Sequence, residues 1–211
     1  PAVLLGRDRV AFWGGGSTKE LPMLVIASTA DGRILRRFEE TRNVLSRSLA
    51  ATPDGRTLYF IDSGTLYSMD AETGARTKLR PANGVAVDPT GTTLVVQLNT
   101  RDGVRMARVD RASGTETAVP FYNDLQLSID PIAGNALGPD GRLVVSVSSR
   151  DTWFTGPALL TLANGFVERV PVRYDGDVRP TTWGNDGSLL GMGVAVRSEL
   201  WRFRPATAQR P

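Results

Sequence analysis

Short apolar runs alternate with tight polar turns along the whole chain. Residues 57–61 and 143–147 are each five residues long and rich in β-branched and aromatic side chains, which is typical of a buried strand. A Pro-Asp-Gly turn precedes both runs, and these residue types favour a tight reversal between strands. No run combines apolar residues at helical spacing with capping residues. The pattern therefore predicts an all-β protein.

The turns belong to an internal repeat. Matching stretches begin at residues 51, 87, 137 and 183, and a fainter copy spans residues 5–13. In each unit a hairpin is followed by a third apolar run, a second polar turn and a fourth run that is partly polar. Four short strands in a repeat of about 42 residues indicate a β-propeller blade. The marker glycines of the four clear units are Gly55, Gly91, Gly141 and Gly187.

We expect residues 1–211 to form a single β-propeller domain of about five four-stranded antiparallel blades. The fifth unit has a third strand at residues 199–204 but no fourth strand of its own, which leaves nineteen predicted strands. An incomplete blade exposes an apolar edge, which natural proteins avoid. Two interpretations follow: residues near Pro1 pair with the last blade, or the chain is a section of a larger ring.

The repeat resembles that of TolB-type, WD-repeat-like propellers. The match is best over residues 52–80, which read Thr52-Pro-Asp-Gly-Arg-Thr-Leu-Tyr-Phe, then Gly64-Thr-Leu-Tyr-Ser-Met-Asp70 and Thr73-Gly74. The Gly-His and Trp-Asp signatures of true WD repeats are absent. The resemblance implies a bacterial propeller of a kind found as periplasmic partners in envelope assemblies or as sensor domains of signalling proteins, in an extracytoplasmic location.

The composition excludes several kinds of catalytic and metal-binding chemistry. The chain has no cysteine and no histidine, so thiolate nucleophiles, imidazole bases and zinc sites built from these residues are excluded. The net charge is +3, but the 23 arginines are scattered and do not alternate with aromatic residues, so we expect no nucleic-acid partner. The longest apolar stretch, residues 21–27, is too short for a transmembrane segment. We predict no cofactor and no metal site.

Unusually long loops mark the candidate site, because function on a rigid scaffold concentrates in loops. In a propeller, the connections between blades and those between second and third strands lie on one face. Residues 121–135 and 148–156 are much longer than their counterparts in the other units. We expect them to share this face with residues 99–103, residues 174–179 and Trp183.

Two kinds of side chain make these loops a candidate binding surface. Aromatic rings offer stacking surfaces, and arginines offer paired donors for a carboxylate, a phosphate or an acidic peptide. Both kinds are also common anchors of protein interfaces. We therefore predict a non-catalytic binding or sensor module that recognises a protein or peptide. The candidate binding residues are Arg101, Tyr122, Arg150, Trp153, Phe154 and Arg179.

A carboxylate-dependent, carbohydrate-active enzyme is the alternative. Two carboxylates that face one substrate can divide the acid and base roles between them. Asp130 with Asp151, and Asp124 with Asp177, are pairs on the expected face. Their spacing in the sequence does not set the separation that catalysis requires, so no catalytic residue is assigned.

Overall fold

The chain folds almost entirely into short antiparallel strands. A computed structural model describes residues 1–14, 21–44, 46–122, 124–149, 154–174, 176–184 and 186–195. Over these residues there are 18 strands and a single 3₁₀ turn, Glu39–Thr41. No helix in the described ranges has the length and apolar character needed to cross a membrane. The predicted all-β class is confirmed.

The strands form five sheets that follow the repeat. Blade 1 contains β1 (Ala2–Leu5), β2 (Arg9–Gly14), β3 (Met23–Ser28) and β4 (Ile34–Phe38). Blade 2 contains β5 (Leu49–Ala51), β6 (Thr57–Asp62), β7 (Thr65–Asp70) and β8 (Arg76–Pro81). Blade 3 contains β9 (Gly84–Val87), β10 (Thr93–Thr100), β11 (Gly103–Asp110) and β12 (Glu116–Val119). Blade 4 contains β13 (Gln126–Leu127), β14 (Arg142–Ser148), β15 (Gly156–Thr161) and β16 (Val167–Arg169). Blade 5 contains β17 (Asp177–Trp183) and β18 (Leu189–Val194).

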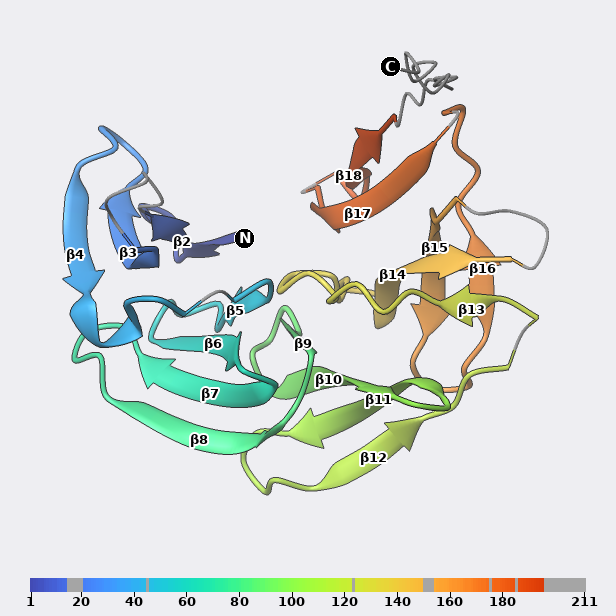
Figure 1. Cartoon of the computed structure of the whole chain (residues 1–211), viewed down its shortest axis with the longest axis horizontal. Helices are drawn as coiled ribbons and strands as arrows, with labels where there is room; N and C mark the ends of the chain where they lie inside the picture. The colour runs from blue at the N-terminus through green and yellow to red at the C-terminus, as the bar shows by residue number, and fades with distance from the viewer. Residues whose placement is uncertain are drawn as a thin grey trace, which may run out of the picture.

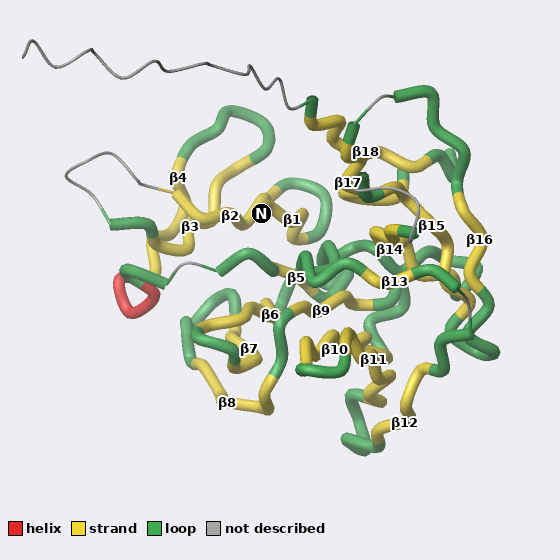
Figure 2. The backbone as a smooth tube through the Cα atoms, turned by 45° about the vertical axis from the view of Figure 1, so that its right-hand side comes forward, coloured by secondary structure: helices red, strands yellow, loops and turns green. Residues whose placement is uncertain are grey.

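The five blades stand side by side around a centre, as the predicted propeller requires. In blades 1 to 3 the first strand lies innermost, and the fourth strands of blades 1 to 4 lie on the perimeter (Figure 1). The tube view shows the same succession of sheets from another side (Figure 2). Neighbouring blades contact each other through their inner strands, for example β1 with β5 and β5 with β9. Between blade 1 and blade 5 the ribbons leave a gap at the top of Figure 1.

The predicted turns build the hairpins of the blades. In the turn between β5 and β6, Gly55 has a φ of 68°, a conformation that glycine adopts without strain. The adjacent Asp54 accepts hydrogen bonds from the Thr52 hydroxyl at 2.5 Å and from the Arg56 backbone N–H at 3.0 Å. These two bonds, in that order, lower the pKa of Asp54 below its usual value. The aspartate therefore holds its own turn.

The hydrophobic core lies between blades, in three clusters. One joins blades 1 and 2 through side chains such as Leu24, Phe38 and Phe60. A second joins blades 2 and 3, and the third joins blades 3 and 4 and is contacted by Trp183 of blade 5. The second strands β6, β10 and β14 have no exposed residue, because a blade stacks on each of their faces.

The pairing of the first strand decides one of the two interpretations of the incomplete fifth blade. Residues Ala2–Leu5 form β1, which pairs with β2 inside blade 1, so the interpretation in which residues near Pro1 complete the last blade is wrong for this strand. These residues follow the repeat because the fainter first unit needs its own inner strand. The predicted third strand at residues 199–204 lies outside the described residues.

Candidate functional site

The loop between the second and third strands of blade 4 ends against the start of blade 5. Thr155 donates two hydrogen bonds to Asp177 Oδ1, from its backbone N at 2.8 Å and from its hydroxyl at 3.1 Å. The Val178 backbone N donates in return to the Thr155 carbonyl at 2.9 Å. These three hydrogen bonds hold the end of the 148–156 loop beside the 174–179 connection.

A pocket of about 740 Å³ opens beside this junction. Phe154 and Tyr174 are 52% and 42% exposed, and both line it. Arg169, at the end of β16, adds a positive charge and forms no ion pair with any residue in the described ranges. The wall between these groups is made by small and apolar residues. We call this pocket the blade 4 pocket, and its lining is Val147, Phe154, Thr155, Gly156, Pro157, Arg169, Val170, Pro171, Val172, Tyr174 and Gly176.

A second pocket, of about 490 Å³, adjoins the first on the side of blade 5. The two pockets share four lining residues, and the second adds Arg173 together with residues of β17 and β18. The Tyr174 ring lies directly on Gly193, where a Cβ would be 2.7 Å from the ring. Together the pockets form what we call the blade 4–5 groove, which follows residues 170–174. The shared residues are Pro157, Val170, Val172 and Tyr174.

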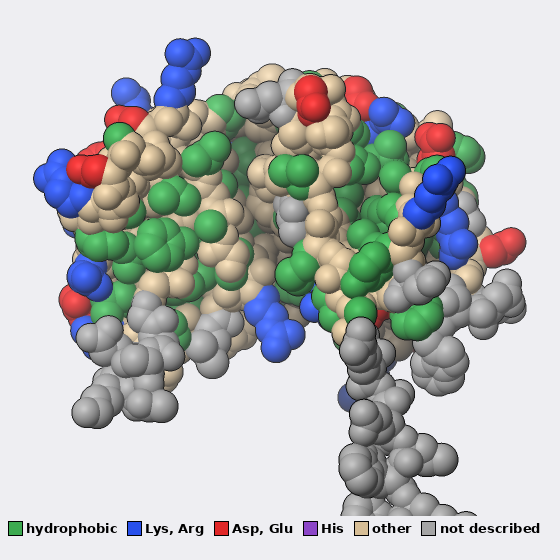
Figure 3. All heavy atoms as spheres, turned by 90° about the horizontal axis from the view of Figure 1, so that it is seen from above, with side chains coloured by type: hydrophobic (Ala, Val, Ile, Leu, Met, Phe, Trp, Pro, Cys, Tyr) green, Lys and Arg blue, Asp and Glu red, His purple; other side chains and the backbone are tan. Residues whose placement is uncertain are grey.

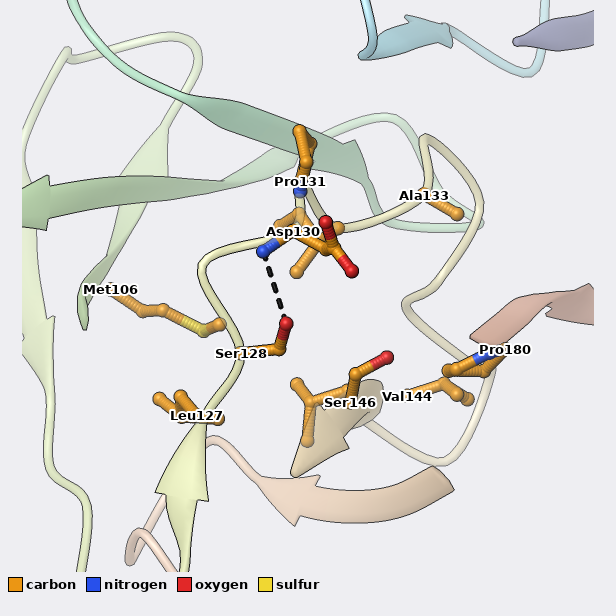
Figure 4. Close-up of a pocket in the computed structure, with 11 residues that line it drawn as sticks. Met106, Leu127, Ser128, Asp130, Pro131, Ala133, Val144, Ser146 and Pro180 are labelled. Atoms are coloured by element: carbon orange, nitrogen blue, oxygen red, sulfur yellow. Dashed lines mark hydrogen bonds between the residues drawn. The ribbon is translucent and has the colours of Figure 1, made fainter. Parts of the chain in front are cut away.

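Arg179 lies apart from this groove, in a small polar site between blades 3, 4 and 5. Its guanidinium is 3.6 Å from the carboxylate of Asp130. Close by, the oxygens of Ser128, Asp130 and Ser146 border a cavity of about 20 Å³ (Figure 4). Such a volume has room for one water molecule. The site is therefore too small for a substrate.

Gln97 holds the loop that carries Asp130. Its side chain is fully buried, and its Oε1 accepts a hydrogen bond from the Ile132 backbone N at 2.9 Å. Its Nε2 donates to the Asp130 carbonyl at 3.1 Å and to the Asn99 side chain at 3.0 Å. The long connection is thus ordered by blade 3, on which it lies.

The predicted binding residues do not form one cluster. Phe154 lines the blade 4 pocket, and Arg179 pairs with Asp130. Arg101 is exposed in the turn between β10 and β11. Tyr122 is 72% exposed and its strand bridge is to Phe166, so it lies next to the turn between β15 and β16. The remaining two, Arg150 and Trp153, lie outside the described residues.

Trp183 corrects the prediction that it shares the long-loop face. It is the last residue of β17, whereas Asp177 is the first, so the two residues lie at opposite ends of the strand. The indole Nε1 donates to the Ala136 carbonyl at 2.9 Å, and the ring packs against Gly138. Trp183 therefore joins blade 5 to blade 4 at the face of the first hairpin turns.

Three groove residues were missed as candidates: Arg169, Arg173 and Tyr174. They lie at the end of the outermost strand of blade 4 and in the connection to blade 5, which is not unusually long. The available signal was the density of cations and an aromatic ring within six residues, 169–174. Loop length alone selected a different connection as the candidate site, residues 148–156.

Two of the carboxylates proposed for catalysis interact with neighbouring residues, and a third lies outside the described residues. Asp177 accepts the two bonds from Thr155, and Asp130 pairs with Arg179. Asp151 lies outside the described residues. Among the residues that the structure describes, no group of three or more acidic, histidine or cysteine side chains is arranged to hold a metal ion.

Comparison with known proteins identifies the fold. No family model matches the chain, and no curated protein matches it either. Among solved structures, TolB from Acinetobacter baumannii superposes with a TM-score of 0.61 at 19% identity, over 85% of this chain and 45% of TolB. A chain of the nidogen/laminin complex gives 0.62 at 17% identity, over 88% of this chain and 68% of that chain.

Two further structures complete the comparison. The β-propeller domain of Myceliophteria thermophila Cps50 (Swd1) gives a TM-score of 0.56 at 14% identity, over 92% of this chain and 64% of that domain. Puromycin hydrolase gives 0.53 at 16% identity, over 87% of this chain and 31% of the hydrolase. The protein is therefore a five-bladed β-propeller with the fold of TolB-like and WD-repeat propellers. It spans about half the length of TolB, and less than two thirds of the Cps50 domain.

Proposed function

We propose that the protein is a non-catalytic binding module that holds an extended, acidic segment of another protein in the blade 4–5 groove. The observation that carries this proposal is the combination of two exposed aromatic rings, Phe154 and Tyr174, with the guanidinium groups of Arg169 and Arg173 along one groove. Aromatic rings give a large contact area at low entropic cost, and arginine binds a carboxylate through two parallel hydrogen bonds.

The chemistry of the groove determines the ligand class. Its apolar wall suits hydrophobic side chains of a peptide, and its two arginines favour acidic side chains next to them. A connection anchored by Thr155 and Asp177 gives the aromatic residues a fixed base, which reduces the entropy lost on binding. Solved propellers of the same fold include a complex of two proteins, nidogen and laminin. This likeness supports a protein ligand without identifying it.

The enzyme alternative has weaker support. Puromycin hydrolase shares the fold, but this chain covers only 31% of it. The best-placed carboxylates, Asp130 and Asp177, are already bonded to neighbouring side chains.

A peptide array tests the proposal. The labelled protein is applied to immobilised 12-residue peptides that combine acidic and apolar residues, with charge-reversed copies on the same array. We expect capture of acidic members and loss of at least tenfold in affinity for Tyr174→Ala, because removing a hot-spot aromatic typically costs about 1–2 kcal/mol or more. Phe166→Ala is the matched control, since Phe166 is 58% exposed but lies outside the groove.

Two results would contradict the proposal. One is equal capture of the acidic and the charge-reversed peptides, and the other is an equal loss of binding in the Tyr174 and Phe166 variants. Asp130→Asn separates the alternative function. It leaves peptide capture unchanged in a binding module, whereas turnover of a panel of oligosaccharides that disappears in this variant indicates an enzyme.

A further inference from the structure

A pocket between blades 3 and 4 opens on the face of the first hairpin turns. Its volume is about 350 Å³, which lies in the range of small-molecule sites. The lining comes from the turn between β9 and β10, from the turn before β14, from the end of β15 with its turn, and from Arg108 of β11. We call it the turn-face pocket, and it shares no lining residue with the blade 4–5 groove.

The first hairpin turns of blades 3 and 4 stand apart, whereas those of the preceding blades touch. A Cβ on Gly55 of blade 2 would lie 2.9 Å from the backbone of Leu5 in blade 1. A Cβ on Gly91 of blade 3 would lie 2.8 Å from the Pro53 ring of blade 2. At the equivalent Gly141 of blade 4, a Cβ would meet no described atom of a more distant residue within 4 Å. The layer of turns is therefore open between blades 3 and 4.

Arg108 occupies an interface position that is apolar or small in the other blades. In blades 1 to 4 the turn after the third strand is closed by the same backbone hydrogen bond, from a glycine N–H to the carbonyl four residues earlier. Two positions before that carbonyl stand Ile26 in blade 1, Ser68 in blade 2 and Leu159 in blade 4. In blade 3 the residue is Arg108, on the same face of β11 as Met106, which is buried in the cluster of blades 3 and 4. Arg108 therefore lies where that hydrophobic interface ends, at the pocket.

The protein does not neutralise the charge of Arg108. Figure 3, which views the molecule from above, shows Lys and Arg side chains interspersed with Asp and Glu over the surface, so charge alone marks no site. Arg108 differs from a surface cation because it lines a pocket and forms no ion pair with any residue in the described ranges. A guanidinium group binds a carboxylate through two parallel hydrogen bonds.

Two carboxylates in the same pocket narrow the class of ligand. An ionised carboxylate has about four acceptor positions. Asp140 accepts two hydrogen bonds from Arg142, at 3.0 Å and 2.6 Å, and Asp88 accepts three, from Thr90, Thr92 and Thr93. Both can therefore accept a further bond from an ammonium group. They repel a dianion such as phosphate, and Arg108 repels a simple cation, whereas a molecule with one carboxylate and one ammonium group suits both signs of charge.

We propose that the turn-face pocket binds a free amino acid with an aliphatic side chain. The carboxylate of the ligand pairs with Arg108, and its ammonium group donates to Asp140 and Asp88. Leu137 and Leu162, each 6% exposed, give the pocket an apolar wall for the aliphatic side chain. This site is independent of peptide binding, because the pocket and the blade 4–5 groove are formed by different residues.

Thermal unfolding of the unaltered protein with leucine, isoleucine or valine tests the proposal. At about 5 mM, we expect at least one of the three to raise the unfolding midpoint by about 3 °C or more, because a ligand that binds only the folded state stabilises it. The decarboxylated and deaminated analogues of that amino acid, such as isoamylamine and isocaproate for leucine, should each raise the midpoint by less than about 1 °C. Each analogue lacks one of the two charges that the pocket pairs.

Isothermal titration calorimetry with variants assigns the binding to this pocket. Arg108→Met keeps an apolar stem but removes the charge, and we expect it to bind the amino acid at least about tenfold more weakly. Arg105→Met is the matched control, since Arg105 is exposed on the opposite face of β11 and does not line the pocket. Tyr174→Ala should bind the amino acid with unchanged affinity, which separates this site from the groove.

Three results would overturn the proposal. The first is that none of the three amino acids raises the midpoint. The second is an equal rise with the deaminated analogue, which indicates a site for carboxylates only. The third is equal affinity in the Arg108 and Arg105 variants. Should Arg108→Met not fold, the analogues still decide the question, because they are compared on the unaltered protein.

Discussion

Replacing Gln97 tests whether one buried amide orders the long connection between blades 3 and 4. In Gln97→Leu the side chain keeps a similar volume but loses its polar atoms. The Ile132 N–H and the Asp130 carbonyl then lack the partners that lie at 2.9 and 3.1 Å. Each buried group left without a partner costs about 1–3 kcal/mol, so we expect a loss of about 3 kcal/mol in the free energy of unfolding. For a domain of this size that is a fall of about 6–12 °C in the unfolding midpoint.

Urea unfolding followed by tryptophan fluorescence measures this loss. Gln126→Leu is the matched control, because Gln126 is exposed on β13 and makes no comparable network among the described residues. Hydrogen exchange of the Ile132 amide adds a local readout, with at least tenfold faster exchange expected in the Gln97 variant. A variant within about 0.5 kcal/mol of the control, with Ile132 still protected, would refute the reasoning.

Three further predictions concern the blades. Gly55→Ala should destabilise the protein by about 2 kcal/mol and Gly64→Ala by about 1 kcal/mol, as measured by urea unfolding midpoints. Both glycines have a positive φ, but only at Gly55 would a Cβ contact backbone, 2.9 Å from Leu5. Phe60→Ala should cost about 3–5 kcal/mol, since Phe60 is fully buried between aromatic rings of blades 1 and 2, and unchanged stability would contradict that packing. The folded-state pKa of Asp54 is lowered, so its contribution is present above the unfolded pKa of about 3.9 and is lost as the pH falls through the folded value. The stability advantage of the unaltered protein over Asp54→Asn should therefore shrink between pH 5 and pH 2 in urea titrations, and an advantage that grows in acid has the wrong sign.

The repeat was readable from sequence because its turns depend on local chemistry. An aspartate that bonds the backbone two residues on, followed by a glycine at positive φ, specifies a reversal wherever it occurs. Asp54 with Gly55 and Asp140 with Gly141 do this in blades 2 and 4. The alternation of buried strands between such turns then leaves few arrangements other than stacked blades.

The site was less predictable because it depends on the course of connections through space. Tyr122 lies beside Phe166 since the connection crosses the perimeter of blade 4 before it turns inward. Nothing in the spacing of the residues specifies that route. Trp183 was misplaced for a simpler reason, because a strand of seven residues carries its two ends to opposite faces. Tyr174 was missed because its importance comes from Gly193, nineteen residues later, on which its ring rests.

The placement of the core between blades has a consequence for how the protein comes apart. Each hydrophobic cluster takes its side chains mainly from two neighbouring blades, so no blade has a hydrophobic core of its own. The stability of the protein therefore resembles a sum of interactions between neighbouring blades along a row of blades. Middle members of the row are held from two sides, whereas the terminal ones are held from one. Fraying should therefore begin at blades 1 and 5 and advance inward, with the hairpin of β10 and β11 in blade 3 among the last amides to exchange.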